Sequence, residues 1–565
     1  MGGRILKNTS DRGQKEQSQS ASGSRLTGRL PLFLASGILT LVASPSYGFG
    51  VVAWCCLIPF LYGVWSCRSW KPATLGGFLA GAAFFGPGVY WLNSVTTVAW
   101  VSLFLYCSIY WAVFGWITYF APRSKPLLSA LVLASSWILL EFIRAIALTG
   151  FPYLLLSHTQ QDFTLLVQSL DAIGSYGLSG VIVAVNVLVY GLLLGPRPGR
   201  LRCGVMMASI FAVACVYGSW RLHAIRPIPT LGVAAVQASV PQEMKEALLG
   251  KYDPAGVLNR YLAATESIPK NTAVDLLVWP ETVVLSPYIL NVSPEALNAE
   301  YAPAAHQAQS SIREVAASRG TYFLVGATSY LPAVYGYVGD RDSAQRIPAA
   351  LWNQRYNSAY LFDAAGRYAG RYDKIHLVPF GEYVPLPRVF PFLSRLVPFT
   401  TSILPGKDQP LFHVAGRTAA ADFGVLICYE DTDAELARRL RRHGADFLVN
   451  ISNDAWFGES ELDQHFVAAR FRAIENRIGV VRVGNNGITA VIDPLGRVPY
   501  LLSKDVGSER VTKNVTGYLL GQVATSGSVS IYTRLGDWPA AVGSLLIVGW
   551  WVIRKRASEK ALSIH

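Results

Sequence analysis

Cys428 is the residue of this chain with the clearest capacity for covalent chemistry. It follows a short apolar run in the segment Gly-Val-Leu-Ile-Cys-Tyr-Glu-Asp, and the six other cysteines all lie before residue 216. A thiol without a nearby partner is either a small apolar side chain packed in a core or a nucleophile. Because cysteine attacks a carbonyl as a thiolate, a nucleophilic role requires a base and a group that stabilises the oxyanion.

Two upstream segments place such groups at the ends of predicted strands. Glu281 follows a buried apolar run and a proline in Leu-Leu-Val-Trp-Pro-Glu-Thr, and its carboxylate could accept the thiol proton. Lys374 lies in Asp-Lys-Ile-His-Leu-Val-Pro-Phe-Gly-Glu, and its ammonium could stabilise an oxyanion. His376 is an alternative base. It lies two positions after Lys374, and residues two apart in an extended segment share one face. Taken singly, Glu281 and Lys374 also fit ordinary structural roles.

These residues lie in a polar block in which short apolar runs alternate with helical stretches. The predicted strands are 231–237, 274–279, 322–327, 358–362, 423–427, 447–451, 480–483 and 489–492. The predicted helices are 254–267, 304–319, 432–443 and 463–477. Strands that alternate with helices indicate a layered α/β domain.

Apolar sequence flanks this block on both sides. Hydrophobic residues make up 52% of the 565 residues and charged residues only 15%, which is typical of a membrane protein. Seven candidate spans lie at 30–46, 49–66, 73–93, 97–121, 126–147, 174–195 and 202–220, and an eighth lies at 538–553. Basic residues gather before the first span and after the second, fourth, sixth and eighth spans. The positive-inside rule therefore places both termini in the cytoplasm and the polar block outside, and it explains the net charge of +13 without nucleic acid.

The predicted fold class is a multi-span α-helical membrane domain with eight transmembrane helices, joined to an α/β domain. The expected parts are a disordered cytoplasmic tail at 1–29, a seven-helix transmembrane domain at 30–220, an exported catalytic domain at 226–532, an eighth transmembrane helix at 537–553 and a basic cytoplasmic tail at 554–565.

In their order along the chain, the Trp-Pro-Glu, Asp-Lys-x-His-Leu-Val-Pro-Phe-Gly-Glu and Ile-Cys-Tyr-Glu segments resemble the nitrilase superfamily, which has a Glu-Lys-Cys triad on an αββα sandwich. Such a domain between seven N-terminal spans and one C-terminal span resembles the bacterial apolipoprotein N-acyltransferase family. The Gly-Glu-Tyr-Val-Pro that completes the lysine segment is its most specific part. In the membrane part, Glu141-Phe-Ile-Arg144 followed by Thr-Gly-Phe-Pro-Tyr is similar to the family's segment after the fifth span.

The resemblance implies that Glu281 is the general base, Lys374 stabilises the oxyanion and Cys428 is the nucleophile. The positions that it implies beside the triad are Glu382, Glu430, Tyr429, whose backbone follows the nucleophile, and Asn357. The candidates for substrate binding are Trp456, Asn453, Glu141 and Arg144. The last two could equally form a structural ion pair, since they share a helix face. No metal and no cofactor is implied.

The implied activity transfers the sn-1 acyl chain of a phospholipid, through a cysteine thioester, to the α-amino group of the N-terminal diacylglyceryl-cysteine of an apolipoprotein. The implied setting is a monomer in the bacterial inner membrane with its catalytic domain on the periplasmic side. A membrane-tethered amidase or nitrilase is the alternative, and a transporter with a vestigial triad is a more distant one. The family commonly has Trp where this chain has Glu246, and the run from Leu386 to Pro398 could be a lipid-facing lid or a packed loop.

Overall fold

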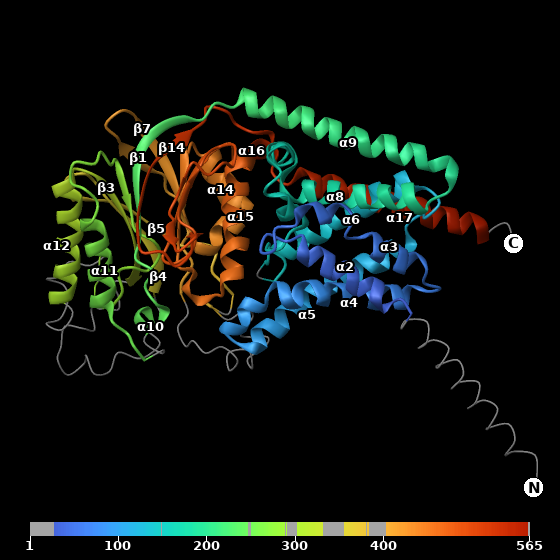
Figure 1. Cartoon of the computed structure of the whole chain (residues 1–565), viewed down its shortest axis with the longest axis horizontal. Coiled ribbons are helices and arrows are strands. Elements are labelled where there is room, and N and C mark those ends of the chain that lie inside the picture. Colours follow the sequence, from blue (N-terminus) through green and yellow to red (C-terminus); the bar gives the residue numbers. More distant parts are fainter. Residues whose placement is uncertain are drawn as a thin grey trace, which may run out of the picture.

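The computed structural model describes residues 28–148, 150–246, 250–286, 288, 290, 302–330, 355–379, 381–383 and 403–562. Figure 1 shows two parts side by side, a helical bundle and a layered sheet domain. The tail expected at 1–29 lies outside the described residues except for its last two positions, and the run from Leu386 to Pro398 lies wholly outside them.

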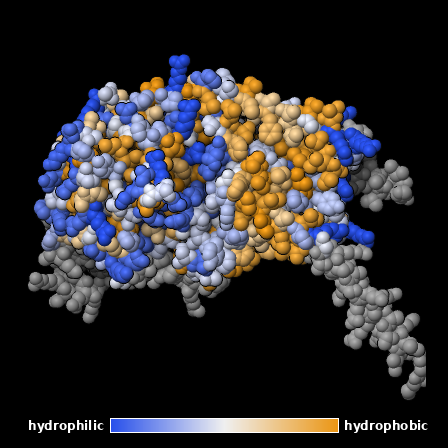
Figure 2. Space-filling view, viewed as in Figure 1, coloured by the Kyte–Doolittle hydropathy of each residue, from blue (hydrophilic) through white to orange (hydrophobic). Residues whose placement is uncertain are grey.

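Each apolar run that predicts a span forms one α-helix of the bundle, in two cases together with a short 3₁₀ helix. These are α2 (Leu30–Val42), η1 (Gly50–Trp54), α3 (Ile58–Trp65), α4 (Trp70–Gly88), η2 (Tyr90–Ser94), α5 (Thr97–Phe120), α6 (Pro126–Ile146), α8 (Leu170–Leu194), α9 (Arg197–Ala224) and α17 (Trp538–Leu562), with η3 (Leu156–Gln160) and α7 (Thr164–Val167) between α6 and α8. In the described chain, α5, α6, α8 and the Gly199–Ala224 part of α9 are long and apolar enough to cross a membrane. Figure 2 shows apolar surface gathered over this bundle, as expected for helices that face lipid.

Small residues let α4 and α5 pack closely. A Cβ at Gly77 would lie 2.3 Å from the backbone oxygen of Trp111, and a Cβ at Gly115 would lie 2.5 Å from that of Ala73. Such crossings are typical of helices that associate within a membrane.

Two six-stranded sheets form the centre of the other part. The first has the order β14-β1-β2-β3-β4-β5, and the second has the order β11-β10-β9-β8-β7-β6. The strands of the first are β1 (Ile228–Gln237), β2 (Leu276–Val278), β3 (Tyr322–Tyr330), β4 (Arg355–Phe362), β5 (Tyr368–Asp373) and β14 (Gly517–Thr525). Those of the second are β6 (Phe412–Ala415), β7 (Ala420–Ile427), β8 (Phe447–Ser452), β9 (Gly479–Gly484), β10 (Ala490–Ile492) and β11 (Tyr500–Leu501), and β12 (Lys504–Val506) pairs with β13 (Glu509–Val511).

Alternation along the strands builds the layers, because successive side chains point to opposite faces. Val233 and Ala235 of β1 face the second sheet, in one buried cluster with Val425 and Ile427 of β7. Residues between them, such as Ala234, belong to the cluster beneath α11 (Pro254–Glu266) and α12 (Ala302–Arg319). On the other side, α14 (Ala434–Arg442) and α15 (Glu459–Asn476) cover the second sheet. The α/β prediction is therefore confirmed as an αββα sandwich.

Helix α15 joins the sandwich to the bundle. Its Ala469 and Ala473 pack on the second sheet. On its opposite face, Val467 and Phe471 pack with Leu178 of α8. A helix with two buried faces fixes the sandwich against the membrane helices.

Buried polar contacts cross the same boundary. The fully buried Arg477 donates from Nε to Asp171 of α8 at 2.8 Å. Glu475 accepts from the backbone and the hydroxyl of Ser175 at 3.0 and 2.6 Å. Because these contacts are shielded from water, they stabilise one relative orientation of the two parts.

Candidate active site

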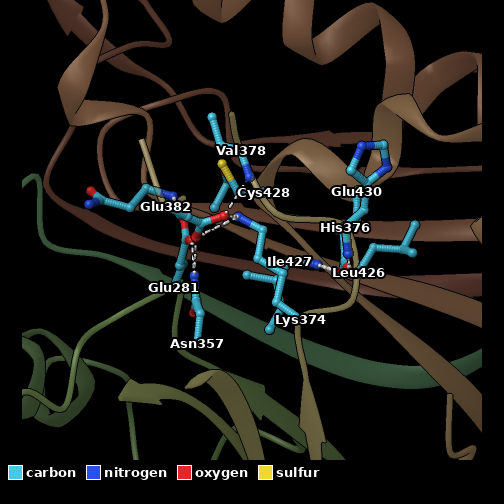
Figure 3. Close-up of polar contacts among 12 residues, drawn as sticks. Glu281, Asn357, Lys374, His376, Val378, Glu382, Leu426, Ile427, Cys428 and Glu430 are labelled. Carbon is cyan, nitrogen blue, oxygen red and sulfur yellow. Dashed lines mark hydrogen bonds and ion pairs between the residues drawn. The ribbon is translucent and has the colours of Figure 1, made fainter. Parts of the chain in front are cut away.

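The two sheets bring the three candidate residues together from strand ends far apart in the sequence. Glu281 follows β2, Lys374 follows β5, and Cys428 follows β7. Figure 3 shows the sulfur of Cys428 beside the carboxylate of Glu281 and the ammonium of Lys374. All three residues are buried, with exposed fractions of 6%, 1% and 7%. A carboxylate, a cation and a thiol thus meet in a place from which most water is excluded.

Cys428 lies at a sharp turn from strand to helix. It is the first residue of the 3₁₀ helix η9 (Cys428–Thr432), and its φ of 53° is in the left-handed region. Such a conformation costs a non-glycine residue about 1–3 kcal/mol and persists only where the surroundings enforce it. The carbonyl of Cys428 accepts hydrogen bonds from Asn450 Nδ2 and His465 Nε2, both at 3.2 Å. These two side chains hold the turn.

The carboxylate of Glu281 is held on both of its oxygens. Oε1 accepts from Asn357 Nδ2 at 2.6 Å and lies 3.8 Å from Lys374 Nζ. Oε2 accepts from the backbone N–H of Asn453 at 2.7 Å. Burial raises the pKa of Glu281 above its ordinary value, although the charge of Lys374 opposes the shift. A carboxylate with a raised pKa is a better proton acceptor.

The ammonium of Lys374 is held in place by Glu382. Nζ lies 2.9 Å from each carboxylate oxygen of Glu382, which also accepts from the backbone N–H of Val378 at 2.7 Å. Burial alone would lower the pKa of Lys374, but the charges of Glu382 and Glu281 outweigh it and raise that pKa. Lys374 is therefore a permanent cation at this point.

The thiol of Cys428 is neutral in the resting site. Burial, and then the negative charge of Glu281, raises its pKa well above the usual range for cysteine. A nucleophilic role for this thiol would therefore need a base beside it to take the proton. Glu281 occupies that position, whereas the ring of His376 is turned away from the sulfur in Figure 3. His376 Nδ1 instead pairs with Asp433 at 3.0 Å.

Glu430 links the lysine segment to the cysteine segment. Its carboxylate accepts from the hydroxyl of Tyr372 and the backbone N–H of Ile427, each at 2.7 Å. It also accepts from the backbone N–H groups of Ile375 and His376, at 2.7 and 3.0 Å. With these four donors, Glu430 positions the backbone and does not face the reacting atoms.

Tyr429 connects the segment of Cys428 to the membrane bundle. Its hydroxyl donates to the backbone oxygen of Gly150 at 3.0 Å. Its ring stacks on Tyr153, with ring centres 5.7 Å apart and an angle of 14° between the planes. The loop that follows α6 therefore packs directly on the residue after Cys428.

Glu141 and Arg144 hold that loop, and no ion pair between them occurs in the described structure. Arg144 Nη1 donates to the backbone oxygens of Phe151 and Tyr153, both at 2.8 Å. Glu141 Oε1 accepts from the backbone N–H of Leu156 at 2.8 Å. Of the two alternatives for these residues, the structural ion pair is therefore not formed, because each side chain bonds to the backbone of the loop instead.

The remaining two candidates lie after β8. Asn453 contacts Glu281 through its backbone, and its side chain donates to Gln242 at 2.9 Å. Trp456 lies at the boundary with the bundle, where its backbone oxygen accepts from the hydroxyl of Ser94 at 3.1 Å. Asn453 therefore belongs to the surroundings of Glu281, and Trp456 to the contact between the two parts.

Sequence reasoning missed Lys245, which lies at the end of α10 (Gln242–Lys245). Its Nζ donates to the backbone oxygen of Glu281 at 3.1 Å, and burial lowers its pKa to about 7. Lys245 precedes the Glu246 position in a short polar segment. Nothing in that segment indicates a buried contact.

Beneath Cys428 lies a group with metal-ligand spacing, formed by Asp454, Glu461 and His465. Arg482 already binds Asp454 at 3.1 Å and Asp431 at 2.8 Å, and His465 Nε2 lies 2.8 Å from Asp431. Because protein cations already face these carboxylates, the geometry favours an ion-pair network over a metal site.

Comparison with known proteins agrees with both parts of the structure. The carbon-nitrogen hydrolase family matches residues 232–505, and the apolipoprotein N-acyltransferase N-terminal domain matches residues 36–188. The apolipoprotein N-acyltransferase of Geobacter metallireducens is 31% identical over 548 residues, which cover 92% of this chain and 94% of the relative. That of Rhodopseudomonas palustris is 29% identical over 513 residues, covering 86% and 87%.

An amidase from Nesterenkonia sp. aligns with 53% of this chain and 92% of its own, at 19% identity and a TM-score of 0.34. That identity and that TM-score are too low to bear on the substrate of this chain. The sandwich is a carbon-nitrogen hydrolase domain of the nitrilase type. The whole chain belongs to the apolipoprotein N-acyltransferase family and is a membrane-embedded protein.

Proposed function

We propose that this protein is an N-acyltransferase that moves the sn-1 acyl chain of a membrane phospholipid to the α-amino group of the diacylglyceryl-cysteine of apolipoproteins. One observation carries the proposal. A buried thiol, a carboxylate with a raised pKa and a cation meet at strand ends, and the residue after the thiol packs on a loop of the membrane bundle. Family membership supports the same activity.

In the first half-reaction, Glu281 takes the proton of Cys428 as the sulfur attacks the ester carbonyl. The ammonium of Lys374 and the backbone N–H of Tyr429 stabilise the oxyanion. The C–O bond then breaks, Glu281 returns the proton to the leaving alcohol, and a lysophospholipid departs. The acyl chain remains on Cys428 as a thioester.

In the second half-reaction, the neutral α-amino group of the acceptor attacks the thioester carbonyl. Glu281 accepts a proton from the attacking nitrogen, and the same two groups stabilise the second oxyanion. The C–S bond breaks, and the proton on Glu281 restores the thiol of Cys428. The product is an amide, so the enzyme follows a ping-pong course with two lipid substrates.

For the setting, we propose eight membrane crossings, a catalytic domain at 226–532 on the periplasmic side of the bacterial inner membrane, and a monomer. The distribution of basic residues supports this topology. Figure 1 also supports it, because α9 and α17 both connect to the sandwich at the same end of the bundle. The proposed assignment places residues 1–29 and 554–565 in the cytoplasm.

The test is transfer in reconstituted vesicles. Purified protein is mixed with a phospholipid that carries an isotopic label in its sn-1 chain and with a synthetic diacylglyceryl-cysteine peptide. We expect the label on the peptide α-amino group, and no transfer by Cys428→Ala. A phospholipid labelled only in the sn-2 chain is the matched control. Hydrolysis of small amides without any transfer would refute the proposal and favour the membrane-tethered amidase.

A further inference from the structure

His465, on α15, faces hydrogen-bond acceptors from both ring nitrogens. Nε2 lies 3.2 Å from the backbone oxygen of Cys428 and 2.8 Å from Asp431 Oδ1. Nδ1 lies 3.1 Å from Asp454 Oδ1 and 3.5 Å from Glu461 Oε1. The side chain is 1% exposed, so water does not replace these partners.

Four oxygen acceptors surround the ring of His465, and they favour a ring that carries a proton on both nitrogens. A neutral imidazole has one donor nitrogen and one acceptor nitrogen, and the acceptor would face oxygen lone pairs without a proton between them. A doubly protonated ring satisfies both sides. Burial and the nearby charge of Arg482 would lower the pKa of His465. The carboxylates of Asp431, Asp454 and Glu461 outweigh both and raise that pKa to about 10.

The charged ring therefore donates to the carbonyl of Cys428. Asn450 Nδ2 donates to the same oxygen at 3.2 Å. The nitrogen of that peptide unit belongs to Tyr429, the second residue of η9, where a backbone N–H has no partner within the helix. Donors on the oxygen of a peptide polarise it and strengthen its N–H as a donor, and a charged donor does so more than a neutral one.

We propose that His465 is a positioning residue that polarises the Cys428–Tyr429 peptide and so strengthens the Tyr429 N–H as a donor to the acyl oxygen. Asn450 acts on the same carbonyl as a neutral second donor. The inference rests on the proposed function, because it assumes an acyl group on Cys428. Beyond Glu281, Lys374 and Cys428, the site would then also need a charged imidazole that donates to the carbonyl of Cys428.

The experiment measures the carbonyl stretch of the acyl-enzyme. Full-length protein in vesicles is acylated with a phospholipid that carries ¹³C or ¹²C at the sn-1 carbonyl, and the infrared difference isolates the thioester band. The variants are His465→Gln, which keeps a neutral donor, and Asn450→Ala. His413→Gln is the matched control, because it makes the same substitution at a histidine whose side chain is 63% exposed and pairs with Asp422.

In His465→Gln we expect the thioester band to move to higher wavenumber and the rate of thioester formation to fall by about three- to tenfold. His413→Gln should leave the band in place. An unmoved band in His465→Gln overturns the inference. If that variant does not fold, an unmoved band in Asn450→Ala overturns it instead. The absence of any acyl-enzyme in the wild type contradicts the proposed function itself.

Discussion

Replacement of Lys374 by methionine tests the charge balance of the site. Methionine keeps a long side chain but removes the cation that lies 2.9 Å from both oxygens of Glu382 and 3.8 Å from Glu281. The buried carboxylate of Glu281 and the partly buried carboxylate of Glu382 are then left without their ammonium. Loss of one partner of a buried ion pair costs about 3–5 kcal/mol. For a domain of this size, where each kcal/mol shifts the melting temperature by about 2 °C, we expect the temperature to fall by about 6–10 °C at pH 8.

The cost should shrink as the pH falls. In Lys374→Met the pKa of Glu281 rises further, because burial is no longer offset by the positive charge of Lys374. The folded variant then binds more protons than its unfolded chain. Its stability therefore decreases as the pH rises from the unfolded pKa of Glu281 to its raised folded pKa. Relative to the wild type, the deficit at pH 5 should therefore be smaller than at pH 8.

Tryptophan fluorescence during heating of the detergent-solubilised protein measures both effects. Lys513→Met is the matched control, because Lys513 pairs with Asp463 at 2.8 Å where both side chains reach water. That pair is worth at most about 1 kcal/mol. The double variant Lys374→Met with Glu382→Gln should recover part of the loss. Wild-type stability in Lys374→Met, or a deficit that grows toward acidic pH, would refute the reasoning.

Three further predictions follow from individual contacts. Burial raises the pKa of Glu281, so the acidic limb of thioester formation should lie above the ordinary glutamate range of about 4.3. Stopped-flow acylation against pH measures that limb, Glu281→Gln should remove most of the rate, and a limb in the ordinary range would contradict the assignment. A Cβ at Gly326 would lie 2.1 Å from the backbone oxygen of the residue before Glu281, so Gly326→Ala should displace the base and slow acylation at least tenfold, about 1.4 kcal/mol in the barrier. Gly527→Ala, which meets nothing within 4 Å, should match the wild type in the same assay. Tyr153→Phe removes a 2.8 Å hydrogen bond to Glu461, whose pKa burial raises to about 7. Because the hydroxyl stabilises the ionised form, the variant should lose about 1.5–3 kcal/mol at pH 8 and less at pH 6, and equal losses in thermal unfolding would count against this contact.

The central strands, and the positions of Glu281 and Cys428 after them, could be predicted from the sequence. Buried strands such as β7 and β8 are apolar on both faces, so their limits are visible as continuous runs. Glu281 and Cys428 follow such runs directly. Lys374 follows β5, which the sequence does not predict as a strand. Lys374 is singled out by the Asp-Lys-Ile-His-Leu-Val-Pro-Phe-Gly-Glu segment instead.

The strands that were missed include both edges of each sheet. β5 and β14 border the first sheet, and β6 and β11 border the second. In β6, buried and exposed residues alternate over only four positions, and β5 is largely polar. An edge strand has one unpaired side and much exposed surface, so its apolar pattern is weak.

Contacts made around the reactive residues could not be read from the chain. His465 and Asn450 reach the carbonyl of Cys428 from 37 and 22 residues away, and Lys245 reaches Glu281 from 36 residues away. Such contacts depend on how α15, α10 and the sheets pack, which local patterns do not specify. For the same reason, the sequence left open whether Glu141 and Arg144 of α6 pair with each other, and the loop that folds back onto that helix provides their partners.

The central claim is that Cys428 carries the acyl chain between donor and acceptor. The intact mass of the protein, measured after incubation with a phospholipid of one defined sn-1 chain, tests this most directly. We predict an increase equal to that acyl group in the wild type, no increase in Cys428→Ala, and loss of the increase when the diacylglyceryl-cysteine peptide is added. An unchanged wild-type mass during active transfer, or an acyl adduct that persists in Cys428→Ala, would contradict the account.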